Sequence, residues 1–401
     1  MSGARPLAAG WGATVRWWRG LGWGGRALYV AGAIEFVLAT INYYHGSGPD
    51  LYRIHVAIKA FLHGGRPYAD TMFVNPPSAC LALLPVGLDG WRAVHVAFHL
   101  LQMGAIAVGG ALCLRMVGLR WAGAAGGVLL LVLSELPAVR LTMLLENVNG
   151  VVFVLGAASL AALLAGRWDA SGVLLGLSLA IKPILIPLLV VPLLLRRWRG
   201  LALAVGVPVV LSGLAAVADP HLLTFFDRQL RFLLNGNAQH LRGANVSIVG
   251  AFHILSLPRA AAEAVRYATL ALALWLAWMR WQEDDRKPGE TGPGALRVLE
   301  VTGILLLAAI LCFSFSWVYY GIYLLPLLVS IVLPGSLLRN VPAAVGILLM
   351  ASPIPLSLDR YAHSTHVFQQ VRPTLAWLLI LVGMGWGLRR ASRAEVVAAP
   401  A

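Results

Sequence analysis

The stretch GVLLGLSLAIKPILIPLLVVPLLLRRWRG, residues 172–200, decides how the chain is predicted to fold. An apolar segment over 170–195 is interrupted in its middle by Lys182-Pro183 and again by Pro187. Proline has no backbone N–H and disrupts a helix interior. The pattern therefore predicts two half-helices that meet within a membrane.

The rest of the chain is typical of a membrane protein that crosses the bilayer many times. Hydrophobic residues make up 59% of its 401 residues and charged residues only 12%. A span needs about 20 apolar residues, and eleven segments approach or reach that length. Together they predict an all-α polytopic protein with about ten to twelve transmembrane helices in one domain, 1–401; the segments are 27–44, 92–116, 121–142, 149–166, 170–195, 199–217, 260–281, 296–315, 319–334, 338–352 and 373–389.

The basic residues predict the orientation of these spans. They gather at the amino terminus and in short connections, as the positive-inside rule requires of cytoplasmic segments. All of these basic connections fall on the cytoplasmic side only if the segment 170–195 enters and leaves the membrane on the same side. This agrees with a hairpin broken at Lys182. The loops 45–75, 218–259 and 353–372 are then external, 282–295 is a cytoplasmic linker, and the protein is expected in the plasma membrane.

Several functional classes are not favoured. The basic residues that give the net charge of +14 lie in the short connections between apolar segments and at the termini. The charge therefore does not indicate nucleic acid as a partner. No P-loop, dinucleotide-binding, HExxH or GxSxG motif is present, and we expect no cofactor. No acidic pair such as DxD lies in an external loop, so we expect no metal requirement.

The first external loop contains a short amphipathic helix. Leu51, Ile54 and Ile58 recur at helical spacing over 51–62, which predicts a helix lying on the membrane surface. Asp50 stands at its amino-terminal edge. On residue chemistry it is either a functional carboxylate for a lipid-linked substrate or a helix N-cap.

Five motifs, in this order along the chain, resemble glycosyltransferase family 87. They are DLYRIHVA (50–57) with Gly64, Tyr68 and NPP (75–77); ENVNGVVFVLG (146–156); the lysine-proline stretch 172–200; GANVSIVGAF (243–252); and SWVYYGIYLLPLLVSIVLPGSLLRN (316–340), which is especially similar to the cell-wall arabinofuranosyltransferase branch. His55 replaces the usual tyrosine, and Asn75 precedes the prolines.

The resemblance implies a GT-C-like fold and an inverting glycosyltransferase. Its donor would be a sugar, preferably arabinofuranose, on a polyprenyl phosphate. Its acceptor would be a cell-envelope glycan or glycolipid at the extracytoplasmic face, so membrane lipids are also partners. Asp50 would accept the proton of the acceptor hydroxyl. Mannose is the alternative sugar, and a lipid or sugar transporter or flippase is the alternative class.

The remaining site candidates have both a functional and a structural interpretation. The donor phosphate could be held by Arg53, His55, Lys182, Arg228, Arg242, Tyr319 and Tyr320. External arginines also bind ordinary lipids, tyrosines form interfacial belts, and a membrane lysine can snorkel. Acceptor or sugar could be held by Glu146, Asn147, Asn149, Asn245 and Ser247, or these residues could cap helices and form turns.

Overall fold

All regular structure in the described part of the chain is helical, which confirms the predicted all-α class. The computed structural model describes residues 22–44, 48–88, 90–235, 245–283, 294–352 and 367–398. Its α-helices are α2 (Trp23–Tyr44), α3 (Pro49–Leu62), α4 (Ser78–Ala82), α5 (Trp91–Met116), α6 (Ala124–Glu135), α7 (Pro137–Leu145), α8 (Asn149–Leu164), α9 (Trp168–Ile181), α10 (Val190–Leu194), α11 (Trp198–Ala218), α12 (Thr224–Asp227), α13 (Gln229–Asn235), α14 (Ile248–Ile254), α15 (Arg259–Gln282), α16 (Ala295–Cys312), α17 (Leu325–Val329), α18 (Val341–Ala351) and α20 (Val367–Ala398). The 3-10 helices are η1 (Pro67–Ala69), η2 (Leu84–Gly87), η3 (Pro183–Leu189), η4 (Pro220–Leu223), η6 (Val318–Leu324) and η7 (Ser330–Val332).

Fewer helices have the length of a full span than the apolar segments predicted. Six described helices are long and apolar enough to cross a membrane: α2, α5, α11, α15, α16 and residues 370–390 of α20. The pair α6 and α7 would make a seventh span, bent by 61° where Pro137 begins the second helix. The other apolar segments form helices of 10–17 residues. The six long helices, the bent pair and these five shorter apolar segments together correspond to most of the predicted spans.

The stretch 170–195 forms the predicted hairpin. Helix α9 ends at Ile181, and the chain returns through η3 and α10. The guanidinium of Arg197 lies 4.4 Å from the centre of the Trp168 ring, and Arg199 pairs with Asp169 at 3.2 Å. Both arms therefore begin and end at the same end of the bundle, with Lys182 at the turn between them.

The turn at Lys182 is held by the NPP motif of the first predicted external loop. Without an N–H at Pro183, the last carbonyls of α9 lose partners that a continuing helix would supply. Asn75 Nδ2 donates to the Ile181 carbonyl at 2.9 Å, and Ser78 Oγ donates to the Ala180 carbonyl at 2.8 Å. The loop over 67–78 is thereby fixed against the break in the hairpin.

Helix α3 packs differently from the prediction. The stripe formed by Leu51, Ile54 and Ile58 is buried within the protein instead of facing lipid, and a Cβ on Gly87 of η2 would lie 2.5 Å from Ile58. On another side of the helix, Tyr52 and Val56 are exposed. The inward stripe fixes the rotation of α3 and therefore the direction of Asp50.

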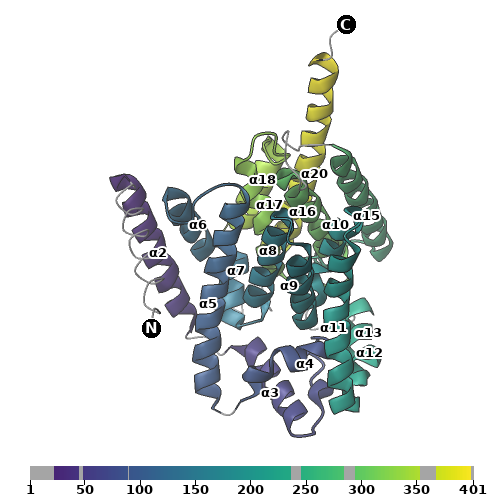
Figure 1. Ribbon diagram of the computed structural model, residues 1–401. Coiled ribbons are helices and arrows are strands. Elements are labelled where there is room, and N and C mark those ends of the chain that lie inside the picture. The colour runs from purple at the N-terminus through teal and green to yellow at the C-terminus, as the bar shows by residue number, and fades with distance from the viewer. Residues whose placement is uncertain are drawn as a thin grey trace.

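The first two of the three loops predicted to be external lie at one end of the molecule. Figure 1 shows α3 and α4 in its lower part with α12 and α13 to their right, on the far side of α11, and all of them away from the protruding carboxyl-terminal part of α20. The Tyr68 and Phe225 rings pack at a tilt, with ring centres 5.7 Å apart, and Gln229 donates to the Tyr68 carbonyl at 3.4 Å. These contacts join the first loop to the second around the tip of the hairpin.

Candidate active site

A cleft lies where the hairpin tip, the start of α3 and the segment 315–320 meet. It holds about 690 Å³ of empty space, open solvent included. Its polar lining comes from Asp50, Arg53, Asn75, Asn147, Lys182, Tyr319 and Tyr320, and its apolar walls include Phe73, Phe232, Leu233, Phe315 and Trp317. We call it the Asp50 cleft. It brings together six of the predicted site residues from four separate segments, among them Asn147, which lies just before α8.

Asp50 lies inside α3 and does not cap it. The N-cap is Gly48 in the left-handed conformation, with φ 53°, and Pro49 takes the first helical position. The interpretation of Asp50 as the N-cap is therefore wrong. Its carboxylate is 26% exposed and pairs with Arg53 at 3.5 Å.

The surroundings of Asp50 favour its protonated form relative to a solvated aspartate. Burial raises the pKa of the Asp50 carboxyl, and the positive charges of Lys182 and Arg53 offset only part of that effect. A carboxylate with a raised pKa is a stronger base once it is ionised. It can accept a proton from a hydroxyl that enters the cleft.

Arg53 is held between two carboxylates at the side of the cleft. Its NH1 lies 3.5 Å from Asp50 Oδ1, and its Nε lies 3.7 Å from Asp70 Oδ2. Asp70 also accepts a hydrogen bond from the backbone N–H of Met72 at 2.8 Å. Asp70 thus fixes Arg53 from outside the cleft and leaves part of the guanidinium facing its interior.

Lys182 is placed by neutral groups. Its Nζ donates to Asn149 Oδ1 at 2.9 Å and lies 5.0 Å and 4.9 Å from the ring centres of Tyr319 and Tyr320. The Tyr323 hydroxyl donates to the same Asn149 oxygen at 2.7 Å. Aromatic faces stabilise an ammonium without neutralising it, so Lys182 presents a positive charge to the cleft opposite Asp50.

Asn147 and Asn149 lie just before and at the start of α8. Asn147 lines the cleft, and its Oδ1 accepts the N–H of Asn149 at 3.0 Å as in a helix cap. Within the described residues, the Nδ2 groups of Asn147 and Asn149 are buried and have no hydrogen-bond partner. Buried donors are almost always satisfied; of these two amides, Asn147 lines the cleft and Asn149 does not.

Glu146 does not line the Asp50 cleft. It is buried, in the left-handed conformation with φ 50°, and its Oε1 lies 2.8 Å from His95 Nε2 and 2.9 Å from His99 Nδ1. The other ring nitrogen of His99 lies 2.9 Å from the Thr40 carbonyl oxygen. These contacts fit a residue that positions Asn147 better than one that touches an acceptor sugar.

His55 and Arg228 lie outside the cleft. His55 Nδ1 lies 2.6 Å from the Val86 carbonyl oxygen, and the ring packs beside Trp91. Arg228 is exposed at the end of α12. Arg242 lies outside the described residues, so its predicted contact with phosphate has no structural counterpart here.

Asn245 and Ser247 form a loop and a helix cap. Asn245 Nδ2 donates to the Ser314 carbonyl at 2.9 Å, and its Oδ1 accepts the N–H of Ser316 at 2.9 Å. Ser247 Oγ accepts the N–H of Gly250 at 3.2 Å and caps α14. Of the two interpretations of these residues, the structure favours turn residues, which hold the 314–316 segment beside the cleft.

Some residues of the site carried no recognisable signal in the sequence. Tyr323 and Gln102 reach the start of α8 from η6 and α5, and Gln102 accepts the N–H of Val151 at 3.1 Å. Trp317 and Phe315 line the cleft but look like ordinary interfacial aromatics in sequence. Asp70 is the one residue that the sequence could have indicated, since it is a further acidic residue in the loop that contains Asp50.

The fold and the cleft together define a class of protein. Helices long enough to span a membrane carry, at one end, a cleft with a carboxylate, an arginine, a lysine and two tyrosines. This is a multi-pass membrane protein with a polar site at one end of its helices.

The chain belongs to glycosyltransferase family 87. The model of that family matches residues 73–308. The alpha-(1->3)-arabinofuranosyltransferase of Mycobacterium tuberculosis is 32% identical over 324 residues, which is 79% of this chain and 71% of that protein. The enzyme of the same name from Mycolicibacterium smegmatis is 28% identical over 360 residues, covering 87% and 80% of the two chains. That from Corynebacterium glutamicum is 23% identical over 343 residues, covering 83% and 79%.

These relationships make the protein a glycosyltransferase and confirm the resemblance seen in the sequence. No solved structure matches the chain. The matched range 73–308 contains Asn147 and Lys182 but begins after Asp50 and ends before Tyr319. The assignment of Asp50 therefore depends on the geometry of the cleft.

Proposed function

We propose that this glycosyltransferase transfers arabinofuranose from a polyprenyl phosphate to a glycan or glycolipid of the cell envelope. The sugar is suggested by the relatives, which are named as alpha-(1->3)-arabinofuranosyltransferases. The observation that supports the mechanism best is the Asp50 cleft, in which a carboxylate faces Lys182 and Arg53. Asp50 can accept a proton there, while the positive charges of Lys182 and Arg53 stabilise a negatively charged leaving group.

The reaction uses the cleft in a single displacement. The acceptor hydroxyl oxygen attacks the anomeric carbon and forms the new glycosidic bond, while Asp50 accepts its proton. The bond between that carbon and the phosphate oxygen breaks, and the phosphate leaves with the bonding electron pair. Lys182 and Arg53 stabilise the charge that develops on this oxygen.

The set of charged groups supports inversion at the anomeric carbon. A retaining double displacement uses one carboxylate as nucleophile and a second acid–base group. Among the described residues that line the cleft, Asp50 is the only carboxylate. Asp70 contacts Arg53 from outside the lining, so a single base with inversion fits the site better.

The arrangement of apolar walls suits a lipid-linked donor. Phe232, Leu233 and Trp317 line the cleft beside the charged groups. A polyprenyl chain could lie along these side chains while its phosphate reaches Lys182. A transporter would more commonly place its site near the bilayer midplane. This cleft is lined by residues of α3 and α13, two helices in the lower part of Figure 1.

The proposed location follows from the basic connections. With the predicted orientation, the loops 45–75, 218–259 and 353–372 lie outside a plasma membrane and the cleft opens at the extracytoplasmic face. The single-domain organisation over 1–401 belongs to the same proposal. Cysteine substitution of exposed Arg228, followed by labelling of intact cells with a membrane-impermeant thiol reagent, tests the orientation, and labelling only after permeabilisation would contradict it.

Donor choice and stereochemistry are tested with the purified protein. Synthetic polyprenyl-phospho-β-arabinofuranose and polyprenyl-phospho-mannose are supplied with a panel of short oligosaccharides, and the product linkage is read by NMR. We expect α-linked arabinofuranose from the first donor. Preferred transfer of mannose would overturn the sugar assignment, and a β-linked product would overturn inversion.

A further inference from the structure

A second cleft lies at the other end of the helices. It holds about 950 Å³ of empty space, open solvent included, and is bounded by the end of α10, the start of α11, the end of α15 and the start of α16. We call it the Arg196 cleft. Its lining consists of arginine, tryptophan, leucine and glutamine, and the residues used below are Arg196, Trp198, Trp278, Trp281 and Arg297.

The two clefts are separated by about the thickness of a membrane. Arg297 lies in the first turn of α16, while Phe315, which lines the Asp50 cleft, follows shortly after that helix ends at Cys312. The 18 residues of α16 span about 27 Å, and the hydrocarbon core of a bilayer is about 30 Å thick. If the Asp50 cleft opens at one membrane surface, the Arg196 cleft lies at the other.

The charge of the Arg196 cleft is positive. Among the described residues that line it, Arg196 and Arg297 are charged and none is acidic. Two arginines that share its end of the molecule are already engaged: Arg197 stacks on Trp168, and Arg199 pairs with Asp169. Arg196 itself is exposed. Arginine binds phosphate oxygens through a planar pair of N–H donors.

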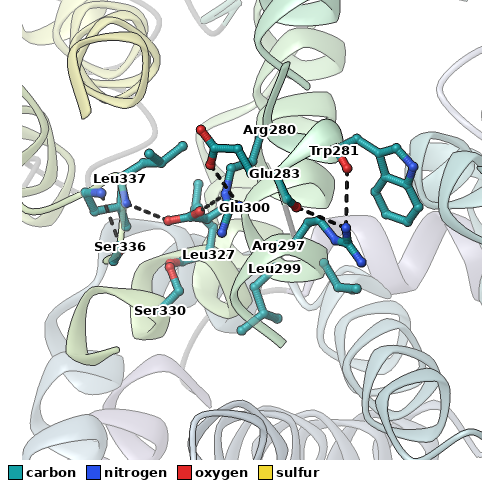
Figure 2. A network of polar contacts seen from close by, with 12 residues as sticks. Arg280, Trp281, Glu283, Arg297, Leu299, Glu300, Leu327, Ser330, Ser336 and Leu337 are labelled. Carbon is teal, nitrogen blue, oxygen red and sulfur yellow. Dashed lines mark hydrogen bonds and ion pairs between the residues drawn. The ribbon is translucent and has the colours of Figure 1, made fainter. Parts of the chain in front are cut away.

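One wall of the Arg196 cleft is rigid. Arg297 lies 4.8 Å from the ring centre of Trp281, and its NH1 donates to the Glu283 carbonyl at 3.0 Å (Figure 2). Arg280 donates to Glu300 at 2.6 Å, and Glu300 in turn accepts the N–H of Leu337 at 2.6 Å. This network joins α15 to α16, so the position of the Arg297 charge is fixed.

The rim of the cleft is apolar and exposed. Trp198 and Trp278 are 61% and 55% exposed, although both lie beside charged groups. Tryptophan with this surrounding is enriched where a bilayer meets water. Such a rim can contact acyl chains while the arginines reach the level of the headgroups.

We propose that the Arg196 cleft binds the phosphate headgroup of an anionic phospholipid in the leaflet opposite the Asp50 cleft. The phosphate is held by Arg196 with Arg297 behind it, and the acyl chains lie against Trp198 and Trp278. This binding site is separate from the transferase site and does not depend on which sugar is transferred. It would tie the carboxyl ends of α10 and α15 to one surface of the membrane.

The test compares lipids retained by the protein after extraction. Wild-type protein is placed in nanodiscs of phosphatidylcholine that contain a minor fraction of phosphatidylglycerol. It is then released, and the lipids that stay bound are identified by native mass spectrometry. We expect retained phosphatidylglycerol in excess of its share, and about five-fold weaker retention for Arg196→Gln, from about 1 kcal/mol per basic residue near an anionic surface. Trp198→Ala should weaken retention as well.

Arg199→Gln is the matched control, since that arginine shares this end of the molecule but lies outside the cleft lining. It should retain lipid as wild type does, with melting temperatures showing that all variants are folded. Equal retention by Arg196→Gln and Arg199→Gln would overturn the proposal. Retention of phosphatidylcholine to the same degree, or displacement by excess inorganic phosphate, would also overturn it, the latter by indicating a site for free anions.

Discussion

Lys182→Met is the substitution that most sharply separates a catalytic lysine from a structural one. Methionine keeps the length and apolar stem of lysine but removes the ammonium that donates to Asn149 at 2.9 Å and lies over Tyr319 and Tyr320. Removal of one preorganised donor to a developing oxyanion typically lowers kcat by about 10²–10³-fold. For Lys182→Met we expect a decrease in kcat of that size, with little change in the affinity for the polyprenyl-phosphate sugar.

The same substitution has a second, independent consequence for pH dependence. Burial raises the pKa of Asp50, and Lys182 opposes that effect. A base works only when ionised, so transfer is present above the pKa of Asp50 and lost as the pH falls through it. Without Lys182 that pKa rises further, and the acidic limb of kcat should move to higher pH.

The assay is transfer from the polyprenyl-phosphate donor, with kcat, KM and their pH profiles measured for the purified proteins. Lys182→Arg keeps the charge and should recover part of the lost rate. Lys59→Met removes a lysine of α3 that lies outside the Asp50 cleft and should stay within about two-fold of wild type. A kcat for Lys182→Met close to that of wild type, with an unmoved acidic limb, would refute the role of Lys182.

Three further predictions concern the support of the site and its chemistry. Gly48→Ala should lower the free energy of unfolding by at least about 1–2 kcal/mol, because a Cβ would lie 2.7 Å from Glu146 Oε2 at a φ of +53°; an unchanged melting temperature would contradict this. Asn75→Ala should lower the free energy of unfolding by about 1–3 kcal/mol, because it removes the donor to the Ile181 carbonyl. A denaturation midpoint equal to that of wild type would show that the hydrogen bond is not needed. Transfer should survive EDTA, and a loss that added magnesium or manganese restores would show a metal requirement.

The hairpin was predictable because its signals are local. Prolines at 183 and 187 break the helix wherever they stand, and the arginines at 196–199 mark one membrane side. The number of full spans was not predictable in the same way. Composition predicts an apolar segment over 149–166 but not that its helix, α8, has 16 residues.

The orientation of α3 depended on a contact that lies far away in sequence. The stripe of Leu51, Ile54 and Ile58 has the same pattern whether it faces lipid or protein. Its partner η2 comes more than twenty residues later, so periodicity alone could not decide between the two. The cap was decidable in principle, since proline favours the first helical position and Pro49 therefore indicates Gly48 as the N-cap.

The site was predicted in part for a related reason. Asp50, Arg53 and Lys182 are charges in apolar surroundings, where charge is costly and therefore informative. Asn245 and Ser247 have short polar side chains that serve equally well in turns, and only the hydrogen bonds to the segment 314–316 show that they do so here. Tyr323 had no distinguishing pattern, and its role at Asn149 depends on the packing of η6 against α8.

The central claim is that Asp50 is the base of a transferase that uses a lipid-linked pentose. The most direct test is the rate of transfer from polyprenyl-phospho-arabinofuranose by Asp50→Asn, with Asp70→Asn as the control that alters the other carboxylate next to Arg53. The account predicts a loss of about 10²–10⁴-fold for Asp50→Asn, with a folded protein and a much smaller effect for Asp70→Asn. Undiminished transfer by folded Asp50→Asn would contradict it.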